Sequence, residues 1–203
     1  MKLYGEAMPA PNPRRVRMFL AEKGLDIPEI RVNLRKGEHK APEHRARNSL
    51  GQVPTLELDE GTCISETISI CRYLEELHPE PPLFGRTAIE RALIDMWVRR
   101  IEFQIMTPVG MFWRHAHPLT AALLTQYKDF GESNRELYAR GLKWLDRELA
   151  GRDWIAGDSY TIADIALLST VDFAAFTGLV IPEEAANIRA WHTRATARPS
   201  AQA

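Results

Sequence analysis

The first residues that could do chemistry in this sequence are an acidic residue and a hydroxyl at the start of a helix. Glu66 and Thr67 stand where a short apolar strand ends and a segment with helical periodicity begins. The first turn of a helix carries unpaired backbone amides and a positive partial charge, and both favour a carboxylate ligand. Acidic and hydroxyl residues also favour this position as simple caps, and capping is compatible with binding.

Two histidines near the middle of the chain are a second candidate. His115 and His117 close a long helical segment. The spacing suggests a metal, but two ligands without a third nearby make a weak motif, and we expect no metal. His115 also suits an ordinary cation at a helix C-terminus, where it interacts favourably with the helix dipole. A role in the chemistry of a functional site and a purely structural role at the helix end therefore stay equally open for His115.

The composition restricts the class of protein. Of the 203 residues, 45% are hydrophobic and 26% are charged, which argues against intrinsic disorder and fibrous repeats. The net charge of -1 gives no general attraction to nucleic acid or to an anionic membrane, so an anionic ligand must be captured locally. Two cysteines and the lack of a secretory signal favour the cytoplasm. No apolar run approaches the roughly 20 residues of a membrane span.

Residues 1–78 combine strand and helix patterns. Alternating polar and apolar residues or short apolar runs predict strands. The predicted strands are residues 2–4, 30–34, 55–58 and 62–64. The last two flank Asp59–Gly61, which favours a tight antiparallel hairpin. A helix between the first two strands favours their parallel pairing.

The first predicted helix follows a proline-rich stretch. Asn12 is expected to cap this helix, and Pro13 suits its first position because the missing amide costs nothing there. Gly24 is expected to end it. A highly charged loop with a weak helix from Pro42 follows the second strand.

Residues 79–85 are the expected linker between two domains. Three prolines occur in this stretch, and no helix interior or central strand would hold them. We therefore expect one domain over residues 1–78 and a second, all-helical domain over residues 86–203. The predicted helices of the second domain are residues 87–116, 119–149, 161–176 and 183–196. Thr161 and Asp164 have the spacing of a capping box.

Four motifs follow one another along both halves of the chain. They are residues 10–16 (APNPRRV), residues 51–56 (GQVPTL) with a hairpin and then residues 65–67 (SET), residues 153–164 (DWIAGDSYTIAD), and residues 198–200 (RPS). In this order and spacing they resemble the cytosolic glutathione transferase family, and the chain is identified as a member of a theta-like or bacterial branch. The resemblance implies an α/β plus all-α fold, with a thioredoxin-like N-terminal domain followed by an all-helical C-terminal domain, and usually a homodimer.

The resemblance also implies where glutathione binds in the first domain. The family residue that corresponds to Val53 offers its backbone amide and carbonyl to the cysteinyl part of glutathione, and the peptide before the next residue, here Pro54, is cis. Thr67 and its amide would hold the γ-glutamyl carboxylate, and Glu66 would pair with the α-amino group. A proline that simply enters a strand is the alternative for Pro54, since cis peptides are uncommon even before proline.

A further part of the implied site is cationic. His39 and Lys40 resemble the position that binds the glycyl carboxylate in one branch of the family, and Gln52 would help at the cysteinyl or glycyl portion. The alternative for the two cations is a solvated loop, since exposed ion pairs contribute little. If His39 and Lys40 do bind, salt should weaken the affinity for glutathione.

The residue that activates the thiol in the family is missing here. Transferases of this family use a Tyr, Ser or Cys close to the first helix, and the Ser- or Cys-equivalent position is Ala10. Tyr4 lies inside the first predicted strand and is expected in the core. A thiol with a pKa near about 8.5 is mostly protonated at neutral pH. The remaining sources of activation are the first helix terminus, cations such as Arg14, and a water held by the second domain.

The long helix that ends at His115 resembles the helix that lines the hydrophobic substrate site in the family. Branch members that lack the usual hydroxyl are thought to use a water positioned by a histidine there, and His115 is the candidate. Phe103, Thr107, Met111 and Phe112 are expected to line the substrate site, although residues at helical spacing more often fill a core.

Two functions are therefore considered. The first is a glutathione transferase that conjugates the glutathione thiolate to hydrophobic electrophiles, with glutathione as co-substrate and neither nucleic acid nor membrane as partner. Ala10 argues against a disulfide-reducing member of the family, because that chemistry needs a nucleophilic cysteine. The second is a non-catalytic glutathione-binding or protein-interaction module with the same fold.

Overall fold

The strands of the chain form one mixed sheet. The computed structural model describes residues 1–6 and 10–203, and within them the sheet has four strands in the order β2-β1-β3-β4. They are β1 (Lys2–Gly5), β2 (Glu29–Arg31), β3 (Thr55–Glu57) and β4 (Cys63–Ser65). Strands β1 and β2 are parallel, as predicted, and β3 and β4 form the predicted antiparallel hairpin. The predicted proline-rich loop falls partly outside the described residues, at positions 8 and 9.

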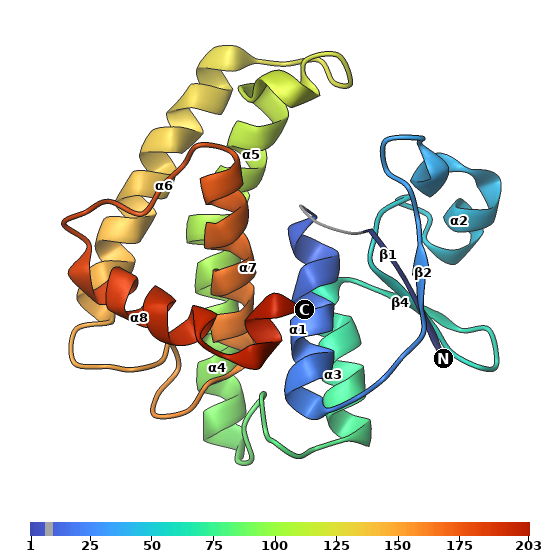
Figure 1. Cartoon of the computed structure of the whole chain (residues 1–203), viewed down its shortest axis with the longest axis horizontal. Helices are drawn as coiled ribbons and strands as arrows, with labels where there is room; N and C mark the ends of the chain where they lie inside the picture. Colours follow the sequence, from blue (N-terminus) through green and yellow to red (C-terminus); the bar gives the residue numbers. More distant parts are fainter. Residues whose placement is uncertain (7–9) are drawn as a thin grey trace. The chain divides into compact units, whose positions relative to one another are not determined.

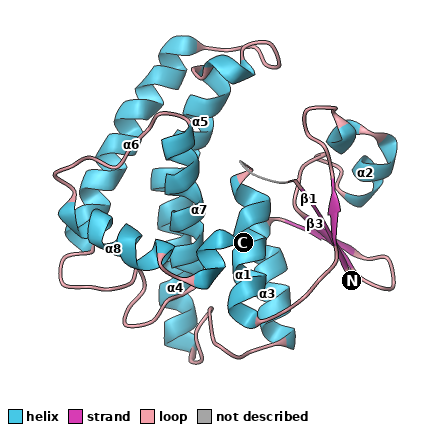
Figure 2. Ribbon diagram, in the orientation of Figure 1, coloured by secondary structure: helices cyan, strands magenta, loops and turns pink. Residues whose placement is uncertain are grey.

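Three helices accompany the sheet, and Figures 1 and 2 show α1 and α3 on one side of it and α2 on the other. They are α1 (Pro11–Lys23), α2 (Pro42–Arg47) and α3 (Thr67–Leu77). Val16 and Phe19 of α1 and Ile70 and Leu74 of α3 are fully buried. The apolar faces of both helices therefore form one core with the sheet.

Helix α1 begins earlier than predicted. Ala10 is its N-cap and Pro11 its first residue, so Asn12 does not cap it and Pro13 is not its first residue. The reason is that the first amides of a helix have no partner within the helix, so a second proline in the first turn is tolerated. Gly24 ends the helix with a φ of 62°, as predicted.

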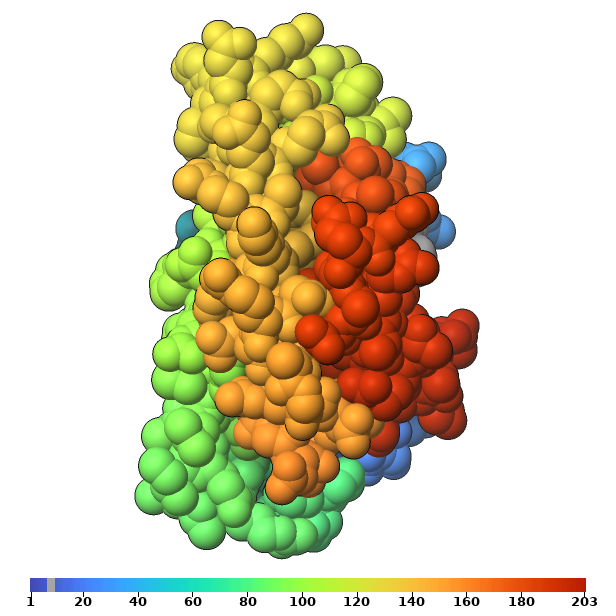
Figure 3. Space-filling model, turned by 90° about the vertical axis from the view of Figure 1, so that its left-hand side faces the viewer, coloured from blue at the N-terminus to red at the C-terminus, as the bar shows by residue number. Residues whose placement is uncertain are grey.

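The second half of the chain is all helical within the described residues. Its helices are α4 (Ala88–Ile101), α5 (Thr107–His115), α6 (Lys128–Glu148), α7 (Ile162–Phe176) and α8 (Ala186–Thr196). Helix α7 is buried over almost its whole length and forms the centre of this core. Figure 3 shows α6 and α8 side by side on one face, where the Ile188 amide donates a 3.0 Å hydrogen bond to the Asp146 carboxylate.

Two predicted helices of this half differ from the structure. The helix expected over residues 87–116 is interrupted by a π-helical segment (Glu102–Met106), because Pro108 has no amide to donate and the hydrogen-bond register shifts just before it. The helix expected from residue 119 begins only at Lys128. Leu119 and Leu123 are exposed, so the apolar spacing that suggested a helix there has no packing partner.

The chain divides into two compact units. The sheet unit comprises Met1–Leu83 together with Pro199–Ala203, and the helical unit comprises Phe84–Arg198. The last residues join the sheet unit through hydrogen bonds to α1: Arg14 Nη2 donates to the Ala201 carbonyl at 2.8 Å, and the Ser200 hydroxyl donates to Glu22. A thioredoxin-like unit and an all-helical unit are the fold class that we predicted. Over the described part of the chain, every helix is too short or too polar to cross a membrane.

Candidate glutathione site

The hairpin brings two sequence-distant parts of the predicted site to one edge of the sheet. Pro54 directly precedes β3 and Glu66 directly follows β4, and these antiparallel strands pair Thr55 with Ser65. Residues 54 and 66 are therefore the next opposed positions along the hairpin. The Val53–Pro54 peptide is cis, as predicted.

Glu66 has an unusual backbone conformation at the start of α3. Its φ is 69°, and it is the one non-glycine residue with a positive φ among the described residues. Side chains with a Cβ avoid this region, and residues held there cost about 1–3 kcal/mol and gather at functional sites. The Glu66 side chain is exposed and makes no hydrogen bond to the first turn of α3. Its carboxylate therefore does not take the capping role that the sequence also allowed.

Thr67 is the first residue of α3, and its hydroxyl accepts a hydrogen bond from a buried cation. Arg15 Nη1 donates a 3.0 Å hydrogen bond to Thr67 Oγ1, and the two residues are 1% and 7% exposed. Arg15 was not among the predicted site residues. Its spacing was the available signal, because Arg15 stands four residues before the core residue Phe19 and so shares a helix face with it.

The backbone of Gln52 is fixed by side chains of α2 and its C-cap. His44 Nε2 donates to the Gln52 carbonyl at 2.8 Å, and Asn48 Nδ2 donates to the same oxygen at 3.0 Å. His44 and Asn48 are both buried, whereas the Gln52 side chain is exposed. The backbone of Gln52, directly before Val53, is therefore held in place, and the Gln52 side chain is exposed to solvent.

The predicted cations lie close to the same segment. Lys40 Nζ donates to the Gly51 carbonyl at 2.9 Å and to the Leu50 carbonyl at 3.3 Å. The pKa of His39 is lowered by burial and by the neighbouring positive charge of Lys40. His39 is therefore neutral at pH 7 and would act as a hydrogen-bond donor, whereas Lys40 carries the charge.

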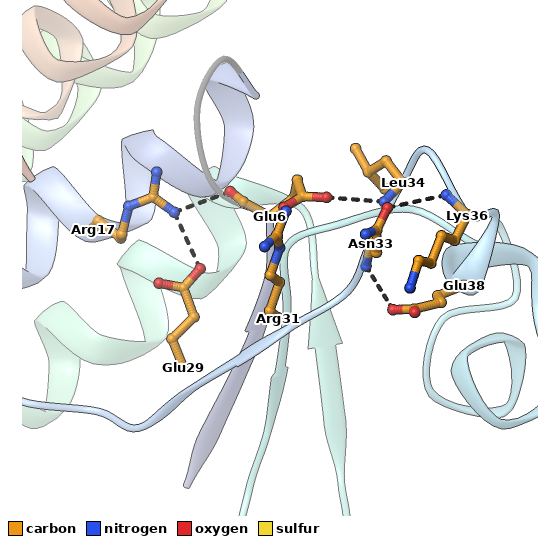
Figure 4. A network of polar contacts seen from close by, with 8 residues as sticks. All are labelled: Glu6, Arg17, Glu29, Arg31, Asn33, Leu34, Lys36 and Glu38. Carbon is orange, nitrogen blue, oxygen red and sulfur yellow. Dashed lines mark hydrogen bonds and ion pairs between the residues drawn. The ribbon is translucent and has the colours of Figure 1, made fainter.

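The loop that carries His39 is anchored to the end of β1 by Glu6, as Figure 4 shows. The buried Glu6 carboxylate accepts a 2.9 Å hydrogen bond from Arg31 Nε and a 3.0 Å hydrogen bond from the Leu34 amide. The Glu6 carbonyl accepts from Arg17 Nη1 at 3.2 Å. Glu6 thereby links α1, β2 and the following loop, and it was not among the predicted site residues.

The predicted substrate-site residues fall into two groups within the helical unit. Phe103, in the π-helical segment, is 64% exposed, and Thr107 is also exposed, while Met111 is half-buried. Phe112 is 3% exposed, and the guanidinium of Arg135 from α6 lies 4.5 Å from its ring centroid. Phe112 therefore packs between α5 and α6, whereas Phe103, Thr107 and Met111 have exposed surface.

His115 and His117 are both held by local contacts. His115 Nδ1 accepts a 3.4 Å hydrogen bond from the Tyr127 amide, and its ring centroid lies 5.4 Å from that of Phe130. His117 Nδ1 accepts from the Leu119 amide at 3.3 Å, and burial lowers the pKa of His117. In the residues that the structure covers, no three His, Cys, Asp or Glu side chains gather as metal ligands.

Sequence and structure comparisons agree with this fold. A family model for the glutathione S-transferase N-terminal domain matches residues 10–77, and one for the C-terminal domain matches residues 109–199. Glutathione S-transferase 2 of Saccharomyces cerevisiae is 41% identical over 194 residues, which cover 94% of this chain and 83% of the yeast protein. Maleylacetoacetate isomerase of Pseudomonas aeruginosa is 32% identical over 178 residues, which cover 83% and 78%.

Solved structures extend the similarity to the whole fold. The crystal structure of Gtt2 from Saccharomyces cerevisiae matches with a TM-score of 0.93 and 38% identity and covers 100% of this chain and 99% of that one. A glutathione S-transferase of class Gtt2 from Vibrio parahaemolyticus matches with a TM-score of 0.87 and 33% identity, over 100% and 96%. A thioredoxin-like unit with this hairpin edge, followed by a helical unit, defines a class of two-domain transferases. The chain belongs to the glutathione S-transferase family.

Proposed function

We propose that the protein is an active glutathione transferase that conjugates the glutathione thiolate to hydrophobic electrophiles. The observation that carries the proposal is Glu66, held at a φ of 69° at the start of α3 with an exposed, uncommitted carboxylate. A strained residue is retained where it does something that a relaxed residue would not do. A carboxylate beside free helix amides suits a zwitterion, whose amine pairs with Glu66 and whose carboxylate meets the helix terminus.

The proposed glutathione contacts follow the hairpin edge. The Val53 backbone, next to Pro54, would bind the cysteinyl part, and Thr67 would hold the γ-glutamyl carboxylate. Gln52, Lys40 and His39 would bind at the glycyl end. The segment from Leu50 to Gln52 is fixed by Lys40, His44 and Asn48, which supports a preformed binding surface there.

Thiol activation is the less familiar part of the proposal, because Ala10 offers no side-chain hydrogen-bond donor. We assign to His115 the role of holding a water that donates a hydrogen bond to the thiolate. The contact with the Tyr127 amide makes Nδ1 of His115 an acceptor, so a neutral ring carries its proton on Nε2. The Nε2–H would donate to the water oxygen. Lowering a thiol pKa by about two units requires roughly 2.7 kcal/mol of preferential thiolate stabilisation.

The remaining elements of the proposal concern substrate, assembly and location. Phe103, Thr107 and Met111 would contact the hydrophobic electrophile, since they are the predicted substrate residues with exposed surface. A homodimer in the cytoplasm, without nucleic-acid or membrane partners, is expected from the family and from the near-neutral composition. The alternative, a glutathione-binding module without catalysis, is less favoured because the relatives across the whole chain include named transferases.

One assay separates the two functions. The purified protein is tested for retention on immobilised glutathione and for turnover of 1-chloro-2,4-dinitrobenzene with glutathione, with free cysteine as the control thiol. Both retention and turnover that needs glutathione are expected. Retention without turnover would favour the non-catalytic module, and a protein that neither binds nor turns over would contradict the proposal.

A further inference from the structure

Glu6 is a buried acidic residue directly after the inner strand β1. It is 8% exposed, and taking a carboxylate out of water is expensive unless strong donors replace the solvent. Two donors do so: Arg31 Nε donates to Oε1 at 2.9 Å, and the Leu34 amide donates to Oε2 at 3.0 Å. Arg31 is the last residue of β2, and Leu34 belongs to the loop that follows. The Glu6 carboxylate therefore attaches this loop to the sheet.

The loop after β2 is also closed on itself, as Figure 4 shows. The Asn33 amide donates a 2.7 Å hydrogen bond to the Glu38 carboxylate, and Asn33 Oδ1 accepts from the Lys36 amide at 3.0 Å. The Glu38 amide in turn donates to the Asn33 carbonyl at 3.2 Å. Because these bonds join both ends of the loop, it should respond as one piece when its attachment to Glu6 is lost.

The closed loop leads directly into the 3-10 helix (Glu38–Lys40) that carries both predicted cations. Lys40 is also held from elsewhere, since its Nζ donates to the Gly51 carbonyl at 2.9 Å. Nδ1 of His39, by contrast, is buried and has no hydrogen-bond partner in the part of the chain that the structure describes. The direction of the His39 ring therefore depends on the loop backbone and, through the loop, on its attachment to Glu6.

We propose that Glu6 is a positioning residue for the glycyl end of glutathione: its carboxylate holds the loop that presents His39 and Lys40. This inference rests on the proposed function, in which those two residues bind the glycyl end. A loop already held in its binding conformation favours the ligand. The negative charge of Glu6 by itself disfavours an anionic ligand. The two effects have opposite signs, so their sum shows which of them dominates.

The test compares two thiol peptides on the full-length protein. Titration calorimetry at pH 7 and constant salt measures the affinity for glutathione and for γ-glutamylcysteine, which lacks the glycyl residue. Both peptides carry two carboxylates and one ammonium group, so the charge lost with Glu6 changes both affinities in the same direction. Glu6→Ala should weaken glutathione binding by about tenfold and γ-glutamylcysteine binding by less than about threefold. The ratio of the two affinities should therefore fall.

Two further Glu6 and loop variants separate positioning from charge and from support of the fold. Glu6→Gln removes the charge but keeps an oxygen that can accept from the Leu34 amide, while the Arg31 side chain, which is 67% exposed, can turn to solvent. This variant should recover most of the ratio. Asn33→Ala leaves the buried carboxylate intact and removes the acceptor of the Lys36 amide. It should lower the ratio, and it replaces Glu6→Ala if that variant does not fold.

Glu29 offers a matched control in the same network. Its carboxylate accepts a 3.1 Å hydrogen bond from Arg17 Nη1, the same nitrogen that donates to the Glu6 carbonyl. Glu29 stands at the start of β2 and so removes an acidic partner from the sheet without touching the loop. Glu29→Gln should leave the ratio of the two affinities unchanged.

The inference is wrong if Glu6→Ala, or Asn33→Ala in its place, changes both affinities by the same factor or strengthens glutathione binding. It is also wrong if Glu29→Gln lowers the ratio as strongly, or if Glu6→Gln lowers it as much as Glu6→Ala does. A wild-type protein that binds neither peptide would instead contradict the proposed function itself. Wild-type binding of glutathione with an unchanged ratio in the variants would contradict the inference alone.

Discussion

Asp164 Oδ1 accepts a 2.8 Å hydrogen bond from Trp191 Nε1, and both residues are fully buried in the helical unit. Asp164 stands in the first turn of α7 and Trp191 in the middle of α8. The same carboxylate also accepts from the amides of Ile155 and Thr161. The capping box that the sequence predicted is therefore also the point where α7, α8 and the preceding loop are joined.

Replacing this carboxylate should weaken the fold more than an ordinary cap substitution does. Asp164→Ala leaves the Trp191 indole N–H and two buried amides without their acceptor, and each such donor costs about 1–3 kcal/mol. We expect a total loss of at least about 3 kcal/mol in the free energy of unfolding, measured by urea denaturation. The exposed Asp158→Ala is the control, and a similar loss in that variant would contradict the explanation.

The same residue should give stability a distinctive pH dependence. Burial raises the pKa of Asp164 to about 6, although its hydrogen-bond donors oppose the shift. Between the unfolded pKa of about 3.9 and the folded pKa, the folded protein binds more protons, so stability from this group falls as pH rises. The difference in unfolding free energy between wild type and Asp164→Asn should therefore decline from pH 4 to 6 and stay constant above. A rising difference would show that the hydrogen bonds outweigh burial.

Glycines in helices α5 and α6 should respond oppositely to alanine. A Cβ at Gly141 would lie 2.5 Å from the Gln104 carbonyl oxygen, inside the π-helical segment, so Gly141→Ala should destabilise by about 1–3 kcal/mol. At Gly110, no described atom lies within 4 Å of the added Cβ, and Gly110→Ala should stabilise by about 0.5–1 kcal/mol through helix propensity. Thermal unfolding measures the midpoint temperature of both variants. Equal changes in this temperature would mean that the packing around each glycine does not decide how alanine changes stability.

Glu66 should be needed for glutathione binding. Glu66→Ala and Glu66→Gln remove the negative charge that pairs with the α-amino group, and each should weaken binding by about tenfold or more. Isothermal titration at low and moderate salt measures the affinity. Glu60→Gln, at an exposed position of the same hairpin, is the control. An unchanged affinity in the Glu66 variants would show that the pocket lies elsewhere.

His115 should affect thiol activation and leave binding alone. His115→Ala removes the proposed donor to the activating water, so the apparent pKa in the pH profile of kcat/KM should rise and the rate at pH 6.5 should fall by about tenfold. The affinity for glutathione should stay the same, and His115→Gln should restore part of the rate. His117→Ala is the neighbouring control. Unchanged activity in His115→Ala would exclude the role.

The elements of this protein follow from local patterns in the sequence. Alternating residues predicted the strands around Asp59–Gly61, and the prolines of residues 79–85 separated an α/β half from a helical half. The Thr161 cap and the Gly24 helix end were also predicted, because capping depends on residue type within a few positions. The cis peptide at Val53–Pro54 and the family itself came from motif resemblance, which needs no coordinates either.

The positions of buried charges and the paths of the helices were decided by tertiary packing. Arg15 is buried and donates a hydrogen bond to Thr67, a residue 52 positions away along the chain. Helix α6 begins at Lys128 and not near residue 119, because the intervening leucines find no partner. Local propensity fixes which segments can be helices and strands. The environment of a side chain depends on segments distant in sequence, so only the folded chain shows which charges lie beside the site.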